Sequence, residues 1–324
     1  MEEFYFSRFI FSARCKTAIF LPPYFGSTLR GGFGHAFRRI VCALKKGKEC
    51  TDCLLKHQCI YAYVFETPIP EDAQMMRKYT AAPHPFILEP SVKNQRTYEK
   101  GEDISFGLTL IGRATDYLPY FIYALDELGR IGIGKGRGKY ELKQVFEENP
   151  LKDEAPVNQE QGNRRVIYRG EDKMLAQLDR PIRWSDILTP SSPSAEMSFS
   201  FITPTRIKYK NSLTKDLEFH VLFRNLLRRI SLLSYFHCGH RLDDQGFKGL
   251  IEQARHIKIV KRALYWHDWE RYSNRQETRM KMGGFMGEIT YEGNFAPFLP
   301  YIKLGEYVHV GKGSSFGLGR YRIV

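Results

Sequence analysis

A short glycine-rich motif occurs twice in this sequence, once near its middle and once at its end. Residues 136–142 read GRGKYEL and residues 317–323 read GLGRYRI, so the shared pattern is Gly-x-Gly-(Lys/Arg)-Tyr-x-(Leu/Ile). A Gly-Lys-Gly triplet accompanies each copy, at 134–136 and 311–313. Internal repeats indicate copies of one supersecondary unit. We therefore expect two copies of one αβ unit, each closing with a glycine-rich loop that leads into a last strand.

The segments before the two motifs share the same order of predicted elements. Alternating apolar and polar residues over 9–16 predict a strand, and apolar spacings of three and four over 29–44 predict a helix. The order recurs as a strand over 197–207 and a helix over 217–236. A unit of strand-helix-strand-strand-helix-strand type forms an antiparallel sheet with its helices on one face, the ferredoxin-like arrangement of RRM domains. The predicted fold class is therefore α+β.

The length of 324 residues and the hydrophobic fraction of 43% suit two packed domains. Polar stretches with proline and glycine mark the boundaries. We expect an N-terminal ferredoxin-like domain over 1–148, a connecting segment over 149–194 and a C-terminal ferredoxin-like domain over 195–324. No apolar run is long enough to cross a membrane, and the acidic start does not resemble a secretory signal, so we expect a cytoplasmic protein.

The charge of the chain points to a polyanionic partner. Lys and Arg outnumber Asp and Glu by 49 to 36, which gives a net charge of +13. Basic and aromatic residues interleave over 255–281, a pattern typical of RNA contact, since guanidinium groups bind phosphates and aromatic rings stack on bases. The alternative is a solvated face with buried aromatic side chains. The candidate RNA-binding residues here are Trp269, Arg271 and Arg275, with Arg206 adding charge from the second repeat.

The glycine loops carry a second candidate contact with phosphate. No helix is predicted after them, which excludes a dinucleotide-binding fingerprint, and the spacing of a Walker A motif is absent. Glycines let a phosphate approach backbone N–H groups, and Lys312 supplies charge beside the second loop. The alternative is that the glycines only make tight turns.

A histidine lies on the polar side of the first predicted helix. At 100° per residue, His35, Arg38 and Arg39 project away from the apolar stripe, so His35 is not expected in the core. A neutral imidazole there could accept a proton from a ribose 2′-hydroxyl. The alternative is a surface histidine without a role.

Four of the six cysteines fall within eighteen residues. Their spacing is Cys42-x7-Cys50-x2-Cys53-x5-Cys59. Four thiolates around a Cys-x2-Cys core suit a tetrahedral metal, most simply a structural zinc ion in a small four-cysteine insertion, while an iron–sulfur cluster fits less well. The alternative is four reduced, packed cysteines.

Five stretches together make the sequence resemble a known family. They are LRGGFGH at 29–35, the cysteine cluster leading to Tyr61 and Phe65-Glu66, PHPF at 83–86, DWERYSNRQ at 268–276 with GGF at 283–285, and VGKGSSFGLG at 310–319. The sequence resembles the CRISPR-associated endoribonucleases of the RAMP superfamily that process precursor crRNA. The resemblance runs over nearly the whole chain.

The resemblance implies two tandem ferredoxin-like domains and cleavage of CRISPR repeat RNA without a metal or other cofactor. The 2′-hydroxyl attacks the adjacent phosphate and leaves a 2′,3′-cyclic phosphate and a 5′-hydroxyl. His35 matches the place of a general base, and Tyr24 or Lys208 could assist it. Repeat RNA, crRNA and further CRISPR effector subunits are the expected partners. By this resemblance, Lys312, Ser314 and Ser315 of the terminal glycine loop would hold RNA backbone. Arg30, Arg38 and Arg39 of the first predicted helix are further candidate RNA-binding residues.

Two other functions stay open at this point. A non-catalytic RAMP subunit that binds crRNA within an effector complex would use the same basic surface, with His35 incidental. A zinc-organised DNA-binding protein would also be basic. The latter is disfavoured because the sequence lacks the Cys-x2–4-Cys-x12-His spacing of recognition-helix zinc fingers.

Overall fold

The chain folds into two compact units in the computed structural model, which describes residues 1–44, 50–76, 79, 81–91, 95–151, 163–188, 194–210, 212–215, 217–242, 244–273 and 278–324. The N-terminal unit comprises Glu3–Arg183 with Phe236–Gly239. The C-terminal unit comprises Met1–Glu2, Trp184–Tyr235 and His240–Val324.

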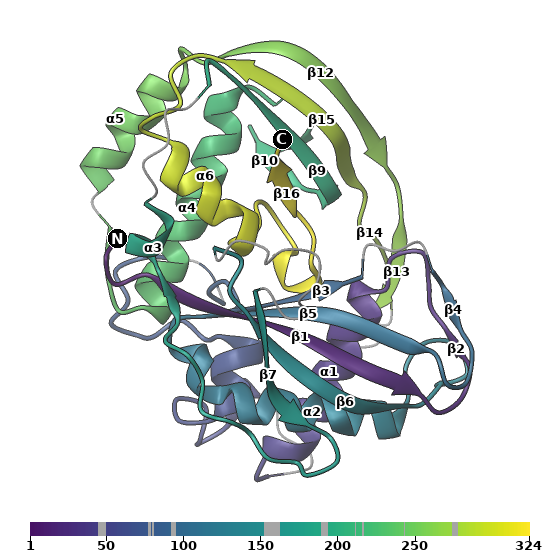
Figure 1. The fold of residues 1–324 in the computed structure, drawn as a ribbon. Helices are drawn as coiled ribbons and strands as arrows, with labels where there is room; N and C mark the ends of the chain where they lie inside the picture. The colour runs from purple at the N-terminus through teal and green to yellow at the C-terminus, as the bar shows by residue number, and fades with distance from the viewer. Residues whose placement is uncertain are drawn as a thin grey trace. The chain divides into compact units, whose positions relative to one another are not determined.

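The N-terminal unit has a five-strand antiparallel path with two helices against one face (Figure 1). Its βαββαβ core is β1 (Tyr5–Cys15), α1 (Gly26–Val41), β3 (Phe86–Pro90), β5 (Asp103–Ile111), α2 (Leu118–Ile131) and β6 (Tyr140–Glu148). The strand order β3-β5-β1-β6-β7 places the first and third strands of the βαββαβ core side by side in the centre, as in a ferredoxin-like fold. The additional elements are β2 (Ile19–Phe20), β4 (Thr97–Tyr98), β7 (Arg164–Arg169), β8 (Ile182–Arg183), the 3-10 turns η1 (Cys50–Asp52) and η3 (Gly112–Tyr117), and the π-helical turn η2 (Ala62–Glu66).

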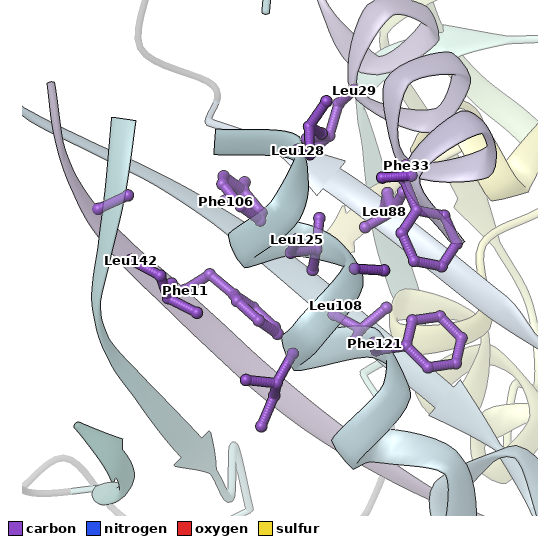
Figure 2. Packing of buried hydrophobic residues seen from close by; sticks show 14 of the residues in the cluster. Phe11, Leu29, Phe33, Leu88, Phe106, Leu108, Phe121, Leu125, Leu128 and Leu142 are labelled. Atoms are coloured by element: carbon purple, nitrogen blue, oxygen red, sulfur yellow. The ribbon is translucent and has the colours of Figure 1, made fainter. Parts of the chain in front are cut away.

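Aromatic side chains join the two helices to the sheet in this unit. Phe11 on β1 and Leu142 on β6 face α2, as Figure 2 shows. The Phe33 ring of α1 stacks on the Phe121 ring of α2 with centroids 5.0 Å apart. A Cβ atom added at Gly32 would come within 2.6 Å of Leu128, so this glycine permits the close approach of the two helices.

The opposite face of the same sheet carries a buried ion-pair network. Arg8 donates to both carboxylate oxygens of Glu89, at 2.9 and 3.1 Å, and to Glu148 at 3.1 Å. All three side chains are buried. Arg164 supplies the second cation, since its Nη2 donates to Glu148 at 2.9 Å, so the two buried carboxylates are paired with two guanidinium groups.

The C-terminal unit repeats the same topology. Its core is β9 (Glu196–Thr205), α4 (Phe219–His237), β12 (Lys258–His267), β15 (Gly284–Glu292), α6 (Leu299–Val308) and β16 (Tyr321–Ile323). The sheet order β12-β15-β9-β16 corresponds strand for strand to β3-β5-β1-β6 (Figure 1). The additional elements are α3 (Trp184–Ile187), α5 (Asp244–Ala254), the hairpin strands β10 (Ile207–Tyr209) and β11 (Ser212–Thr214), the hairpin strands β13 (Glu270–Ser273) and β14 (Thr278–Lys281), and the 3-10 turn η4 (Ser314–Phe316).

The repeated motif has a common structural cause. Tyr140 donates to the Leu125 carbonyl of α2, and Tyr321 donates to the Ile302 carbonyl of α6, both at 2.7 Å. A Cβ atom at Gly305 would meet the Tyr321 hydroxyl oxygen, so a helix glycine makes room for the tyrosine. Each motif thus anchors the last strand of its unit to the helix before it.

Two details differ from the sequence-based expectations. Within the expected connecting segment 149–194, β7 pairs with β6, β8 pairs with β1, and α3 belongs to the C-terminal unit. Helix α1 ends at Val41 and not at residue 44 as predicted, because Cys42 is extended, and Leu44 is left 47% exposed.

Among the described residues, no helix combines the length and the apolar character that a membrane crossing needs.

Candidate nucleic-acid interface

The second glycine loop, residues 309–320, connects α6 to β16. Gly311 has a φ of +83°, and a Cβ atom there would come within 2.6 Å of the Arg206 carbonyl oxygen. The backbone N–H of Lys312 donates to that same oxygen at 2.9 Å. The Thr203 hydroxyl donates to the Gly317 carbonyl at 2.9 Å. These contacts hold the loop firmly against the end of β9.

Four basic side chains gather beside this loop, and we call them the cationic cluster. They are Arg206, Lys208, Arg228 and Lys312. Burial lowers the pKa of the Lys312 ammonium, and the positive charge of Lys208, which faces it, lowers the pKa further, as do Arg206 and Arg228. Lys208 and Lys312 are both exposed, so their charges are accessible to a ligand. Like charges held this close to one another favour a bound anion.

Two guanidinium groups of the C-terminal unit have buried N–H groups without hydrogen-bond partners among the described residues. They are Nε of Arg206 and Nη2 of Arg229. Burial lowers the pKa of both, and that of Arg229 falls to about 9. Arg206 Nη1 contacts Met282 Sδ at 2.9 Å, and Arg229 Nε donates to the Val308 carbonyl at 2.6 Å, directly before the glycine loop. Buried donors without a protein partner are commonly completed by a water molecule or an ion.

The two serines expected to hold RNA backbone are largely covered. Ser314 and Ser315 in η4 are each 6% exposed. Little of either side chain is open to a ligand in this structure. Lys312, two residues earlier, is the exposed cation of the loop.

Helix α1 presents an open face around His35 in the N-terminal unit. His35 is exposed, and Gly31, one turn earlier, is exposed as well. A Cβ atom at Gly31 would meet nothing within 4 Å, whereas one at Gly34 would overlap the Phe65 ring. Gly31 therefore leaves bare helix backbone beside the imidazole, while Gly32 and Gly34 serve internal packing.

The three α1 arginines expected to bind RNA all have protein contacts. Arg30 donates to His84 Nε2 at 2.8 Å and lies over the Phe65 ring at 4.3 Å. Arg38 lies 5.8 Å from the Tyr61 ring centroid. Arg39 is exposed and lies 3.5 Å from the Glu127 carboxylate. Arg39 is consequently the one of the three whose salt bridge would exchange most easily for a phosphate.

The remaining candidates for catalysis lie on different elements. Tyr24 lies just before α1, which begins at Gly26. His35 lies about 14 Å along the helix axis from that first residue, so Tyr24 and His35 are not neighbours on the helix. Tyr24 is partly buried. Lys208 lies on β10 in the C-terminal unit.

The basic aromatic stretch contains β12, which pairs with β15, and the hairpin of β13 and β14 that lies between β12 and β15 in the sequence. Trp269 is partly buried next to β13, and Arg271 lies on β13 opposite Met280 of β14. Arg275 lies outside the described residues. Earlier in the stretch, Tyr265 and Trp266 on β12 are 55% and 37% exposed. These two rings are available for stacking on bases.

The four clustered cysteines do line one hollow, of about 30 Å³, with Lys56 and Arg38 in its wall. Among the described residues, however, no three His, Cys, Asp or Glu side chains are placed to hold a metal ion together. The zinc site stays a prediction.

Sequence reasoning missed Arg228 and Arg229. Both lie on α4, where basic residues alternate with the apolar stripe. The helical period therefore predicts only that they belong to the polar face of the helix. Only the tertiary structure shows that Arg228 belongs to the cationic cluster and that Arg229 contacts the Val308 carbonyl before the glycine loop.

Comparison with known proteins assigns the family. A family model described as the N-terminal domain AF_1859_N matches residues 4–178, more than half of the chain. The chain belongs to the AF_1859_N family. A second family model, described as CRISPR-associated endoribonuclease Cas6, matches residues 199–321. The chain is thus Cas6-like, with an AF_1859_N domain as its N-terminal unit.

Solved structures share the fold of this Cas6-like chain over its whole length. A Cas6 product complex matches with a TM-score of 0.58 at 16% identity, and Thermus thermophilus Cas6 matches with 0.54 at 15% identity. Both alignments cover 99% of each chain. An uncharacterized protein of Archaeoglobus fulgidus is 23% identical over 305 residues, which is 94% of this chain and 92% of the relative. The predicted double ferredoxin-like fold is confirmed.

Proposed function

We propose that this Cas6-like chain is an endoribonuclease that cleaves CRISPR repeat RNA, matures crRNA and needs no metal for the chemistry. The match of residues 199–321 to the Cas6 model is the observation that carries the proposal. The cationic cluster beside the glycine loop supports an RNA partner. CRISPR effector subunits are proposed as further partners.

In the proposed reaction the nucleophile belongs to the substrate. The ribose 2′-oxygen bonds to the adjacent phosphorus, the bond from phosphorus to the 5′-oxygen breaks, and a 2′,3′-cyclic phosphate remains. His35 accepts the proton of the 2′-hydroxyl, and the departing 5′-oxygen takes a proton from Lys208, Tyr24 or water. The open helix face at Gly31 supports close approach of a ribose to His35. The cationic cluster would bind phosphates of the RNA backbone.

The test is incubation of the purified protein with repeat RNA in EDTA, followed by analysis of the fragment ends. We expect fragments with 2′,3′-cyclic phosphate and 5′-hydroxyl ends. His35→Ala should lose cleavage by at least about 100-fold, the usual contribution of a general base, with RNA affinity nearly unchanged. His57→Ala is the matched control, because His57 is also exposed but lies outside α1 and outside the candidate RNA-binding residues.

Two results would contradict the proposal in different ways. A requirement for added magnesium would refute the metal-independent chemistry. Tight binding of repeat RNA by the wild-type protein without any cleavage would instead favour the non-catalytic crRNA-binding subunit.

A further inference from the structure

Between α1 and η2, the described residues of the segment from Ala43 to Ile60 touch the hydrophobic core of the N-terminal unit through Cys50, Cys59 and Ile60. None of its described side chains is buried. Leu44, Leu54 and Leu55 are 47%, 92% and 41% exposed. Ordering a residue costs about 1–2 kcal/mol of backbone entropy, and apolar burial normally offsets that cost. The described part of this segment therefore gains only limited stabilisation from apolar burial.

Sulfur atoms take the inward positions that apolar side chains leave free. Cys50, Cys53 and Cys59 are each partly buried, and together with Cys42 at the end of α1 they line one hollow of about 30 Å³. Lys56 contributes to the wall, while the leucines do so only through Leu44.

Short backbone turns direct the four cysteines to this hollow. The Cys42 N–H donates to the Arg38 carbonyl at 3.0 Å and ends α1. The Cys53 N–H donates to the Cys50 carbonyl at 3.4 Å, which closes the Cys-x2-Cys turn. The Cys59 N–H donates to the Leu55 carbonyl at 2.8 Å. Three separate pieces of backbone thus bring sulfur to one place.

We propose that Cys42, Cys50, Cys53 and Cys59, which line this hollow, bind one zinc ion and that the ion links the end of α1 to the turns that carry the other three cysteines. Zinc prefers four thiolates in tetrahedral geometry at about 2.3 Å. Each thiol releases its proton to solvent on binding. Four thiolates and Zn²⁺ carry a net charge of −2, and Arg38 and Lys56 in the wall of the hollow offset it.

Binding requires the hollow to close. In the part of the chain that the structure describes, no three potential ligands are yet close enough to share an ion. The turn 50–59 must therefore move its sulfurs toward Cys42 as zinc binds. This closure should protect the backbone around residues 54–58 from proteases, since all of these residues except the partly buried Lys56 are exposed and proteases cut exposed loop tips.

The test uses the full-length protein purified under reducing conditions. Metal analysis should find one zinc ion per chain, and replacement by Co²⁺ should give the intense visible absorption of tetrahedral thiolate coordination. A strong chelator should remove the ion and increase tryptic cleavage after Lys56. Cys53→Ser should lose the zinc, whereas Cys238→Ser, outside the segment, should keep it. None of these readouts involves RNA, so they are independent of the proposed cleavage.

Two results would overturn the proposal. One is protein that stays free of zinc after incubation with an excess and gives no cobalt–thiolate absorption. The other is protection from trypsin that depends on disulfide bonds among the four cysteines, all of which are free thiols in this structure. If Cys53→Ser fails to fold, the chelator experiment on the wild-type protein still decides between these outcomes.

Discussion

Replacing Lys312 by alanine should weaken RNA binding and also stabilise the free protein. Lys312 faces Lys208, with Arg206 and Arg228 nearby, and burial together with these charges lowers the pKa of its ammonium group. Removing one of several mutually repelling cations relieves that repulsion when no anion is bound. Because the side chain is exposed, the gain in unfolding free energy should stay below about 1 kcal/mol.

The effect on RNA binding can be worked out from counterion release. For single-stranded nucleic acid, each phosphate contact changes the slope of log affinity against log salt by about 0.7. Between about 50 and 200 mM salt, loss of one contact therefore removes about 0.4 log units of salt dependence, a factor of about 2.6. Over this range of salt, we expect the RNA affinity of the wild type to fall by a factor about 2.6 larger than the RNA affinity of Lys312→Ala falls. The assay is fluorescence anisotropy with repeat RNA in a His35→Ala background.

The pH dependence of stability provides a second readout of the same charge. The pKa of Lys312 is lower in the folded protein than in the unfolded chain. At pH values between these two pKa values, the unfolded chain therefore binds more protons than the folded protein. Wild-type stability therefore rises with pH across that window, and the advantage of Lys312→Ala should shrink there. Lys100→Ala, at an exposed turn before β5, is the control. The reasoning would be refuted if Lys312→Ala kept the wild-type slope of log affinity against log salt and had a lower free energy of unfolding than the wild type.

Four further substitutions test the packing. Gly31→Ala should stabilise α1 by about 1 kcal/mol, since its Cβ atom would meet open space. Gly34→Ala should destabilise the protein, because its Cβ atom would overlap the Phe65 ring. Thermal melts should show a higher Tm for the first variant and a lower Tm for the second. Arg8→Met should cost about 3–5 kcal/mol in urea unfolding, because it leaves the buried Glu89 without its cation; a loss below about 1 kcal/mol would contradict this. Tyr321→Phe removes one buried hydrogen bond and should cost about 1 kcal/mol by the same assay, and no loss would argue against the anchoring role of the repeat.

Local patterns in the sequence were sufficient for much of the fold. The repeated tyrosine motif predicts two equivalent units, and each tyrosine does anchor its last strand. The apolar stripe of the first helix places His35 on the outer face, where the structure has it. These predictions depend only on the period of a helix or strand and on near neighbours along the chain, which composition and spacing encode directly.

Tertiary contacts decided which residues form the candidate site. In the sequence, Gly31 and Gly34 belong to the same glycine-rich stretch, yet one faces open space and the other the Phe65 ring. Arg30 is engaged by His84, more than fifty positions away, while Arg228 of α4 joins Lys312 beside the glycine loop. Such pairings depend on how helices and loops pack across long stretches of chain. Residue spacing carries no information about that packing, so the sequence gives the elements and the fold gives the cluster.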